Sequence, residues 1–122
     1  MILLLTLLTI KHFLLDFLYQ PAYQWQNKGT YGHLGGVLHA GQHSLATLVL
    51  LSFFTPLSVA LWLSVIEFFI HYHMDWFKMW YNARKGWRCN TSPEFWVLTG
   101  FDQMIHSLTY IGIVYALHLS NQ

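Results

Sequence analysis

Five pairs of ionisable residues, each spaced four apart, lie inside otherwise apolar segments of this chain and constrain its fold more than any other feature. The pairs are His12/Asp16, His39/His43, Glu67/His71, His71/Asp75 and Asp102/His106. Residues four apart share one face of an α-helix. A charged side chain at the centre of a bilayer costs about 2.5–3.5 kcal/mol on insertion scales. Apolar helices that carry these groups need a compensating partner, and a bound metal is the most economical one because Asp, Glu and His are metal ligands.

The composition places these segments in a membrane. Of the 122 residues, 55% are hydrophobic and 9% are charged, whereas soluble domains average about 25% charged residues. The formal net charge is +1, so the chain lacks the basic face that a nucleic-acid partner requires. The composition therefore favours an integral membrane protein and argues against nucleic-acid binding.

Four apolar segments are each near or above the ~20 residues that cross a hydrocarbon core. Pro21 stops the first segment, and Ser92-Pro93-Glu94, with an acid in the first turn, is a helix start signal before the last. The sequence thus predicts an all-α fold: one integral-membrane domain over residues 1–122, built as a four-helix transmembrane bundle. The predicted spans are 2–20, 33–53, 56–80 and 93–119.

Charge in the connections predicts the orientation. Lys28 lies in one of the two longer connections, and Arg84, Lys85 and Arg88 lie in or beside the other, with Lys78 just before it. Both connections lie on one side of a four-span protein, and positive charge marks the cytoplasmic side. We therefore expect both termini on the opposite side of the membrane.

The polar pairs are predicted to meet in one layer. At about 1.5 Å per helical residue, all of them fall roughly 6–20 Å below the cytoplasmic helix ends, although the helices alternate in direction. The predicted ligands form a metal site in the cytoplasmic leaflet: His12, Asp16, His39, His43, His71, Asp75, Asp102 and His106. Gln20 and Gln103 flank them and would orient ligands through hydrogen bonds. Glu67, one turn deeper than His71, is a candidate ligand, general base or proton relay, and Lys78 with the nearby arginines is a candidate contact for an anionic head group.

The ligand set indicates two ions. Three aspartates and Glu67 carry four negative charges if ionised, which two divalent ions would neutralise. Carboxylate-bridged di-metal sites in helical bundles use ligands at this spacing. Imidazole and carboxylate without thiol suit Zn, Mn, Fe or Co equally, so we expect a divalent transition metal of undetermined identity.

The leading functional hypothesis is a metal-dependent hydrolase that acts on a membrane lipid or lipid-linked substrate, such as a lipid or isoprenoid phosphoester. Several alternatives stay open at this stage. The polar groups could be interhelical contacts or line a wet cavity, or form a non-enzymatic ion or proton pathway. The chain could also be an oxidative di-metal enzyme, or a phage factor that binds a host membrane protein. Homo-oligomerisation, substrate and metal identity stay undetermined.

The motifs resemble those of a known family. KHFLLDFLYQ, HAGQH, HYHMDWFK and FDQMIH combine HxxxDFxxQ, HxxxH, HxxxDxxK and DQxxH. This combination resembles domain-of-unknown-function family 3307, a family of small phage and bacterial membrane proteins. The layout is also similar to that of LexA-regulated inner-membrane metal-dependent hydrolases. The resemblance implies the same polar positions and a phage or bacterial source. We therefore expect a location in a bacterial inner membrane, where the orientation predicted from charge makes both termini periplasmic.

Overall fold

The computed structural model describes residues 1–120, which form five α-helices and one π-helical turn and contain no strand. The all-α fold that the sequence predicts is therefore confirmed for this part of the chain. The elements in order are α1 (Ile2–Phe13), η1 (Leu14–Leu18), α2 (Ala22–Asn27), α3 (Leu34–Leu51), α4 (Leu57–Lys85) and α5 (Pro93–Ser120).

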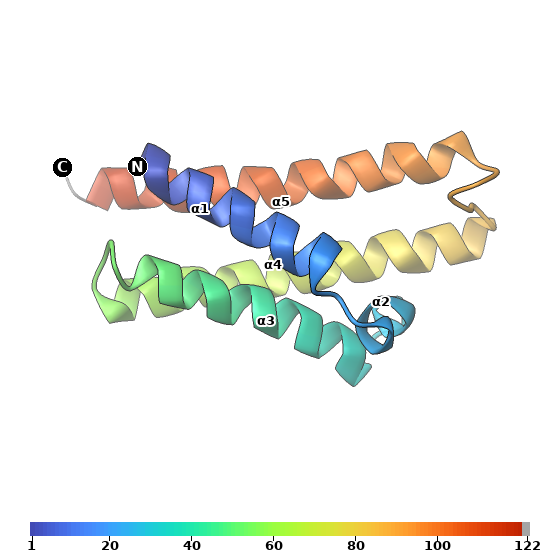
Figure 1. The fold of residues 1–122 in the computed structure, drawn as a ribbon, viewed down its shortest axis with the longest axis horizontal. Coiled ribbons are helices and arrows are strands. Elements are labelled where there is room, and N and C mark those ends of the chain that lie inside the picture. Colours follow the sequence, from blue (N-terminus) through green and yellow to red (C-terminus); the bar gives the residue numbers. More distant parts are fainter. Residues whose placement is uncertain (121–122) are drawn as a thin grey trace.

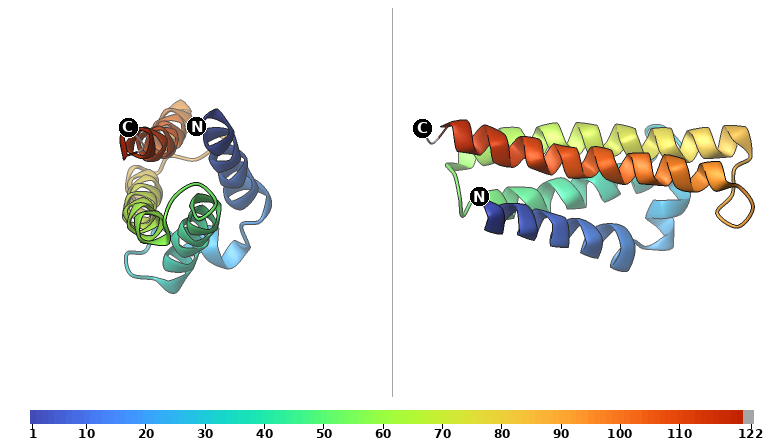
Figure 2. Two further views of the ribbon diagram at one scale, coloured as in Figure 1. Left: turned by 90° about the vertical axis from the view of Figure 1, so that its left-hand side faces the viewer. Right: turned by 90° about the horizontal axis from the view of Figure 1, so that it is seen from above.

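The four longer helices lie side by side around a common interior (Figures 1 and 2). Helix α1 packs against α3 and α5, and α4 packs against the same two helices, so the four form a closed ring. Both chain ends and the short α3–α4 connection lie at one end of the bundle, whereas α2 and the α4–α5 connection lie at the other (Figure 1). The two longer connections therefore share one end, as the four-span topology requires.

The described helices differ from the predicted spans in two places. Helix α4 continues to Lys85, where Gly86 ends it with a left-handed φ of 70°, five residues beyond the predicted end. The sequence analysis also missed α2. Pro21 ends the first segment as predicted, but with ψ at 155° it serves as the N-cap of this short helix.

Helix length and hydropathy support membrane crossing for part of the bundle. Helices α3 and α4 are long and apolar enough to cross a bilayer. Helix α1 has 12 residues, and η1 extends its helical path by five more. Crossing of the membrane by all four long helices therefore remains a prediction.

The distribution of side chains is inverted relative to a soluble protein. Large apolar side chains cover the outside; for example, Ile2 is 85% exposed, Phe53 80% and Val97 74%. The buried set, by contrast, contains more polar and charged residues than hydrophobic ones. Soluble domains rarely expose contiguous apolar surface on this scale, and buried ionisable groups facing a bundle interior are typical of membrane proteins.

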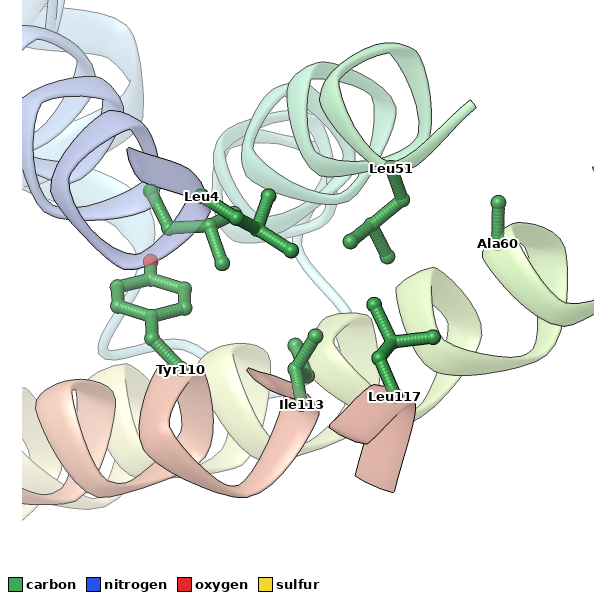
Figure 3. Close-up of a cluster of buried hydrophobic side chains, with 7 residues drawn as sticks. Leu4, Leu51, Ala60, Tyr110, Ile113 and Leu117 are labelled. Carbon is green, nitrogen blue, oxygen red and sulfur yellow. The ribbon is translucent and has the colours of Figure 1, made fainter. Parts of the chain in front are cut away.

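An apolar cluster closes the end of the bundle that carries the chain termini (Figure 3). Side chains from all four long helices meet there, and the hydroxyl of Tyr110, which accepts a hydrogen bond from Lys11, is the one polar group among them: Leu4, Leu8, Leu51, Ala60, Tyr110, Ile113 and Leu117. The ionisable residues accordingly lie beyond this cluster, towards α2.

Candidate metal centre

The interior next to the apolar cluster holds an unusual density of buried ionisable side chains. His39, His43, His71 and His106 are each at most 1% exposed, and Asp102 is fully buried. They come from α3, α4 and α5, whereas His12 and Asp16 come from α1 and η1. The single layer of polar groups that helix counting predicts is thus observed as a set of direct contacts.

A first group of potential ligands joins three helical segments. One ligand atom from each of Asp16, His39, His43 and His71 lies within 4.8 Å of all the others. Within this group, Nε2 of His39 lies 3.0 Å from Oδ1 of Asp16 and 3.3 Å from Nε2 of His71. The rings of His43 and His71 have centroids 3.9 Å apart.

A second group shares one member with the first. His71, Asp75 and His106 also place ligand atoms within 4.8 Å of one another. Oδ2 of Asp75 lies 3.5 Å from Nε2 of His71 and 3.1 Å from Nε2 of His39, while Oδ1 lies 3.4 Å from Nε2 of His106. Asp75 therefore lies between the two groups and could bridge two ions.

These distances fit a metal coordination sphere. Zinc-type bonds of about 2.0–2.2 Å at tetrahedral angles separate neighbouring ligand atoms by roughly 3.3–3.6 Å. The contacts among His39, His71, Asp75 and His106 fall in or near this range. The spacing of these atoms therefore suits a metal ion, although the ammonium group of Lys28 contacts Oδ2 of Asp75 at 2.9 Å.

Unpartnered buried atoms in the same groups also suit an ion. Neither ring nitrogen of His43 has a hydrogen-bond partner within the described residues, and Nδ1 of His71 has none either. Buried polar atoms are normally satisfied, and an exception calls for a specific explanation such as a bound ion.

Two predicted ligands, His12 and Asp102, lie beside these groups rather than in them. Both ring nitrogens of His12 have polar neighbours: Nδ1 is 3.1 Å from the hydroxyl of Tyr110, and Nε2 is 2.9 Å from Oε1 of Gln103. Asp102 accepts a hydrogen bond from Lys78 at 2.7 Å and lies 3.2 Å from Nε2 of His106. His12 and Asp102 therefore lie in contact with other polar side chains of the interior, outside the two groups.

Gln103 and Gln20 lie where the sequence analysis expects supporting groups. The side-chain amide of Gln103 donates to Asp16 and to Asp102, each at 3.1 Å. Gln20 donates to Asp16 at 3.3 Å and lies 3.0 Å from the ring of His39. Asp16 itself belongs to the π-helical turn, closed by a 2.8 Å hydrogen bond from the Tyr19 amide to the Leu14 carbonyl. Such turns occur frequently at functional sites.

The two predicted catalytic residues are both ion-paired. Glu67 accepts a 2.7 Å hydrogen bond from Lys11, and its second oxygen, Oε2, has no hydrogen-bond partner within residues 1–120. Lys78 is bonded to Asp102 and lies 3.7 Å from Asp75. The structure thus places Glu67 beside the centre and Lys78 at its edge.

Sequence analysis did not assign Lys11 and Lys28 to the site. Lys11 also donates to Thr47 at 2.8 Å and to Tyr110 at 3.2 Å. Lys28, read as a charge of the connection, is 5% exposed and lies 2.9 Å from Asp75 and 3.7 Å from Asp16. Lys11 could have been recognised from the sequence, because it is an isolated lysine inside an apolar span and precedes His12. Nothing in the sequence indicates that Lys28 is buried, because its inward position depends on α2.

These lysines change the charge of the site. Four buried carboxylates, from Asp16, Glu67, Asp75 and Asp102, face three buried ammonium groups, from Lys11, Lys28 and Lys78. With neutral histidines the site carries a net charge of −1, not the −4 from which the sequence analysis inferred two ions. One divalent ion is therefore enough to reverse the sign.

A cleft of about 600 Å³ leads to the centre from the end of the bundle that carries α2. Its polar wall includes residues that belong to the centre or bond to it, together with an exposed arginine of the α4–α5 connection: Asp16, Gln20, Lys28, Lys78, Gln103 and Arg88. Arg84 and Lys85 do not line it; their cations lie 5.5 Å over the rings of Trp80 and Tyr81.

Comparison with known proteins gives one match. A family model described as "Protein of unknown function (DUF3307)" matches residues 4–122, which include all four motifs quoted above. No curated protein and no solved structure matches the chain.

Proposed function

The chain belongs to the DUF3307 family, and we propose that it is a membrane-embedded, metal-dependent hydrolase acting on a lipid or isoprenoid phosphoester. The observation that supports metal binding most strongly is His43, a fully buried imidazole with no hydrogen-bond partner on either nitrogen in the described chain. It lies in a group with Asp16, His39 and His71. A merely structural polar core would be expected to satisfy such a ring.

The inverted distribution of polar and apolar side chains supports the membrane assignment. We propose that α1 with η1, α3, α4 and α5 all cross the bilayer of a bacterial inner membrane. Three of the six lysines and arginines are exposed, namely Arg84, Lys85 and Arg88. All three lie near the α4–α5 connection, which favours a cytoplasmic position for that end and a periplasmic one for both termini.

The chemistry follows from the ligand types. A Zn, Mn, Fe or Co ion held by imidazole and carboxylate lowers the pKa of bound water and polarises a phosphoryl oxygen. Asp75, placed between the two ligand groups, would allow a second ion to share the site. The unpartnered Oε2 of Glu67 would accept a proton, with Lys11 holding the carboxylate in position.

An ion or proton pathway through the bundle fits the structure less well. The cluster of Leu4, Leu51, Leu117 and their neighbours fills the end opposite the cleft, and its one polar group, the hydroxyl of Tyr110, is turned towards Lys11 and His12. A conducting path would need polar groups on both sides of the centre.

Product release from membrane phospholipids and isoprenoid phosphates, measured with and without chelator, tests the proposal. We expect turnover that chelation abolishes and that the His71→Ala and Asp102→Ala variants lose. His73→Ala is the matched control on the same helix, because His73 faces outward and bonds to Phe69 and Tyr31. Turnover that persists in chelator, or that His73→Ala removes equally, would contradict the assignment.

A further inference from the structure

We propose that the cleft is a receptor for the phosphate-type head group of an amphiphile, and that metal binding prepares this receptor by releasing Lys28 and Lys78 from the carboxylates of the centre. The proposal rests on the proposed function, because it requires a metal at the His/Asp centre.

Lys28 and Lys78 each contact a carboxylate of the metal centre and also line the cleft. The ammonium group of Lys28 lies 2.9 Å from Oδ2 of Asp75, and that of Lys78 lies 2.7 Å from Oδ2 of Asp102 and 3.7 Å from Oδ1 of Asp75. Both side chains also line the cleft. The ammonium groups therefore contact the carboxylates on the side from which a ligand would approach.

A metal would compete with these ammonium groups. Divalent ions and ammonium groups repel at distances of a few ångströms, most strongly where water is scarce. When Asp75 binds a metal through the oxygen that Lys28 now contacts, the lysine head has to move, and the adjoining cleft is the open space. The same holds for Lys78 if Asp102 or Asp75 turns towards the metal.

The charge of the site then calls for an anion. With four carboxylates, three lysines and neutral histidines, the site has a net charge of −1 without metal. One divalent ion changes it to +1 and two ions change it to +3. A buried charge without a counter-ion is costly, so the metal-loaded centre favours an anionic ligand at the point where the two lysines are released.

The rest of the cleft suits an amphiphile better than free phosphate. Trp25, Trp87 and Phe95 also line it, and most of its wall is apolar. Arg88 lines it as an exposed residue and can bind phosphate oxygens with two parallel hydrogen bonds. A phosphate head group would thus meet three cations while its tail remains in contact with aromatic side chains.

Coupling between metal and anion is the measurable consequence. If the metal raises the affinity for the anion by some factor, the anion raises the affinity for the metal by the same factor. Calorimetric titration of the full-length protein in dodecyl maltoside, with and without bound Co²⁺, measures both. Dodecylphosphonate is a suitable probe because its carbon–phosphorus bond resists hydrolysis. We expect it to bind the Co²⁺ form at least tenfold more tightly.

Methylphosphonate, inorganic phosphate and dodecyltrimethylammonium separate the contributions. We expect the two short anions to bind the Co²⁺ form at least tenfold more weakly than dodecylphosphonate, and the cationic amphiphile to show no dependence on Co²⁺. Inorganic phosphate binding as tightly as dodecylphosphonate would overturn the amphiphile assignment. Equal binding of the cationic and anionic amphiphiles would overturn the receptor altogether.

Paired variants locate the site. Arg88→Gln should weaken dodecylphosphonate binding three- to tenfold, whereas Arg84→Gln should leave it unchanged, because Arg84 is also an exposed arginine near this connection but lies over Trp80 instead of lining the cleft. Lys78→Met should weaken binding at least tenfold while Co²⁺ still binds. Equal losses in the two arginine variants would indicate general surface charge and contradict the proposal.

The outcomes also separate this inference from the proposed function. A protein that binds no Co²⁺ would disprove the metal centre itself. A protein that binds Co²⁺ but holds dodecylphosphonate equally well without it would keep the metal centre and disprove the release of the lysines.

Discussion

The ammonium group of Lys11 lies 2.7 Å from the carboxylate of Glu67, and both side chains are at least nine-tenths buried. Lys11 is also bonded to Thr47 and Tyr110. The pair lies where the metal centre meets the apolar cluster, so α1 contributes a structural cation, Lys11, and, one residue later, His12 beside the centre. Removing one partner of a buried ion pair strongly destabilises a protein, because the other charge is left buried and unpaired.

We therefore predict a large and non-additive effect of substitutions at this pair. Lys11→Met and Glu67→Gln should each lower the free energy of unfolding by about 3–5 kcal/mol, because each leaves a buried charge unpaired. The double variant should be more stable than the sum of the two losses predicts. Denaturation in mixed micelles measures the three variants, and Lys85→Met, an exposed position, is the control. Simple additivity would show that the two charges are not coupled.

The sequence predicted one part of this site well and the rest poorly, for physical reasons. The histidines and aspartates were identified because spacing by four puts them on one helix face, and apolar neighbours make their burial costly. The lysine partners of Asp75 and Glu67 could not be predicted, because Lys28 and Lys11 lie on other segments of the chain. Pairing between segments depends on tertiary packing, which local periodicity does not encode.

Leaving out the buried lysines changes the predicted charge of the site. Counting carboxylates alone gives −4 and favours two ions, whereas the three buried lysines change the charge to −1 when the histidines are neutral. Helix α2 is the structural cause for Lys28. Six residues are too few to show helical periodicity, and Pro21 was read as a stop rather than as the start of a second helix.

Close packing of α2 on α3 gives a second prediction. A Cβ atom at Gly35 would lie 2.5 Å from the backbone carbonyl oxygen of Tyr23, whereas one at Gly41 would meet no atom within 4 Å. Gly35→Ala should therefore destabilise the protein by about 1–3 kcal/mol and disturb Lys28. Gly41→Ala should be neutral or stabilise by about 0.5–1 kcal/mol, because alanine favours the helix. Thermal unfolding of the two variants tests this, and equal melting temperatures would contradict the packing.

A third prediction concerns the orientation, and Cys89 provides a native probe. It is an exposed free cysteine in the α4–α5 connection. We expect a membrane-impermeant maleimide to leave Cys89 unlabelled in intact spheroplasts and to label it after lysis, because the exposed cations around it favour the cytoplasm.

The control for orientation places the cysteine at the opposite end of the bundle. Ser120→Cys in a Cys89→Ser background should be labelled before lysis, since the chain termini lie opposite the α4–α5 connection (Figure 1). Labelling of Cys89 from outside, together with protection of position 120, would invert the orientation and move the centre to the periplasmic leaflet.

A fourth prediction separates ligands from neighbouring histidines on α4. His71 belongs to both potential ligand groups, whereas His73 lies on the outer surface, where it bonds to Phe69 and Tyr31. His71→Ala should lower metal affinity at least tenfold, and His73→Ala should leave it unchanged. Competition with a metal-binding dye measures both. Equal affinities would show that His71 holds no ion.

Elemental analysis of the wild-type protein, purified in detergent without added chelator, tests the central claim most directly. Mass spectrometry of the elements should find between one and two Zn, Mn, Fe or Co ions per chain, and the same amount after gel filtration. A folded, monodisperse protein that contains no transition metal, and takes none up when it is dialysed against each of these ions, would contradict the account.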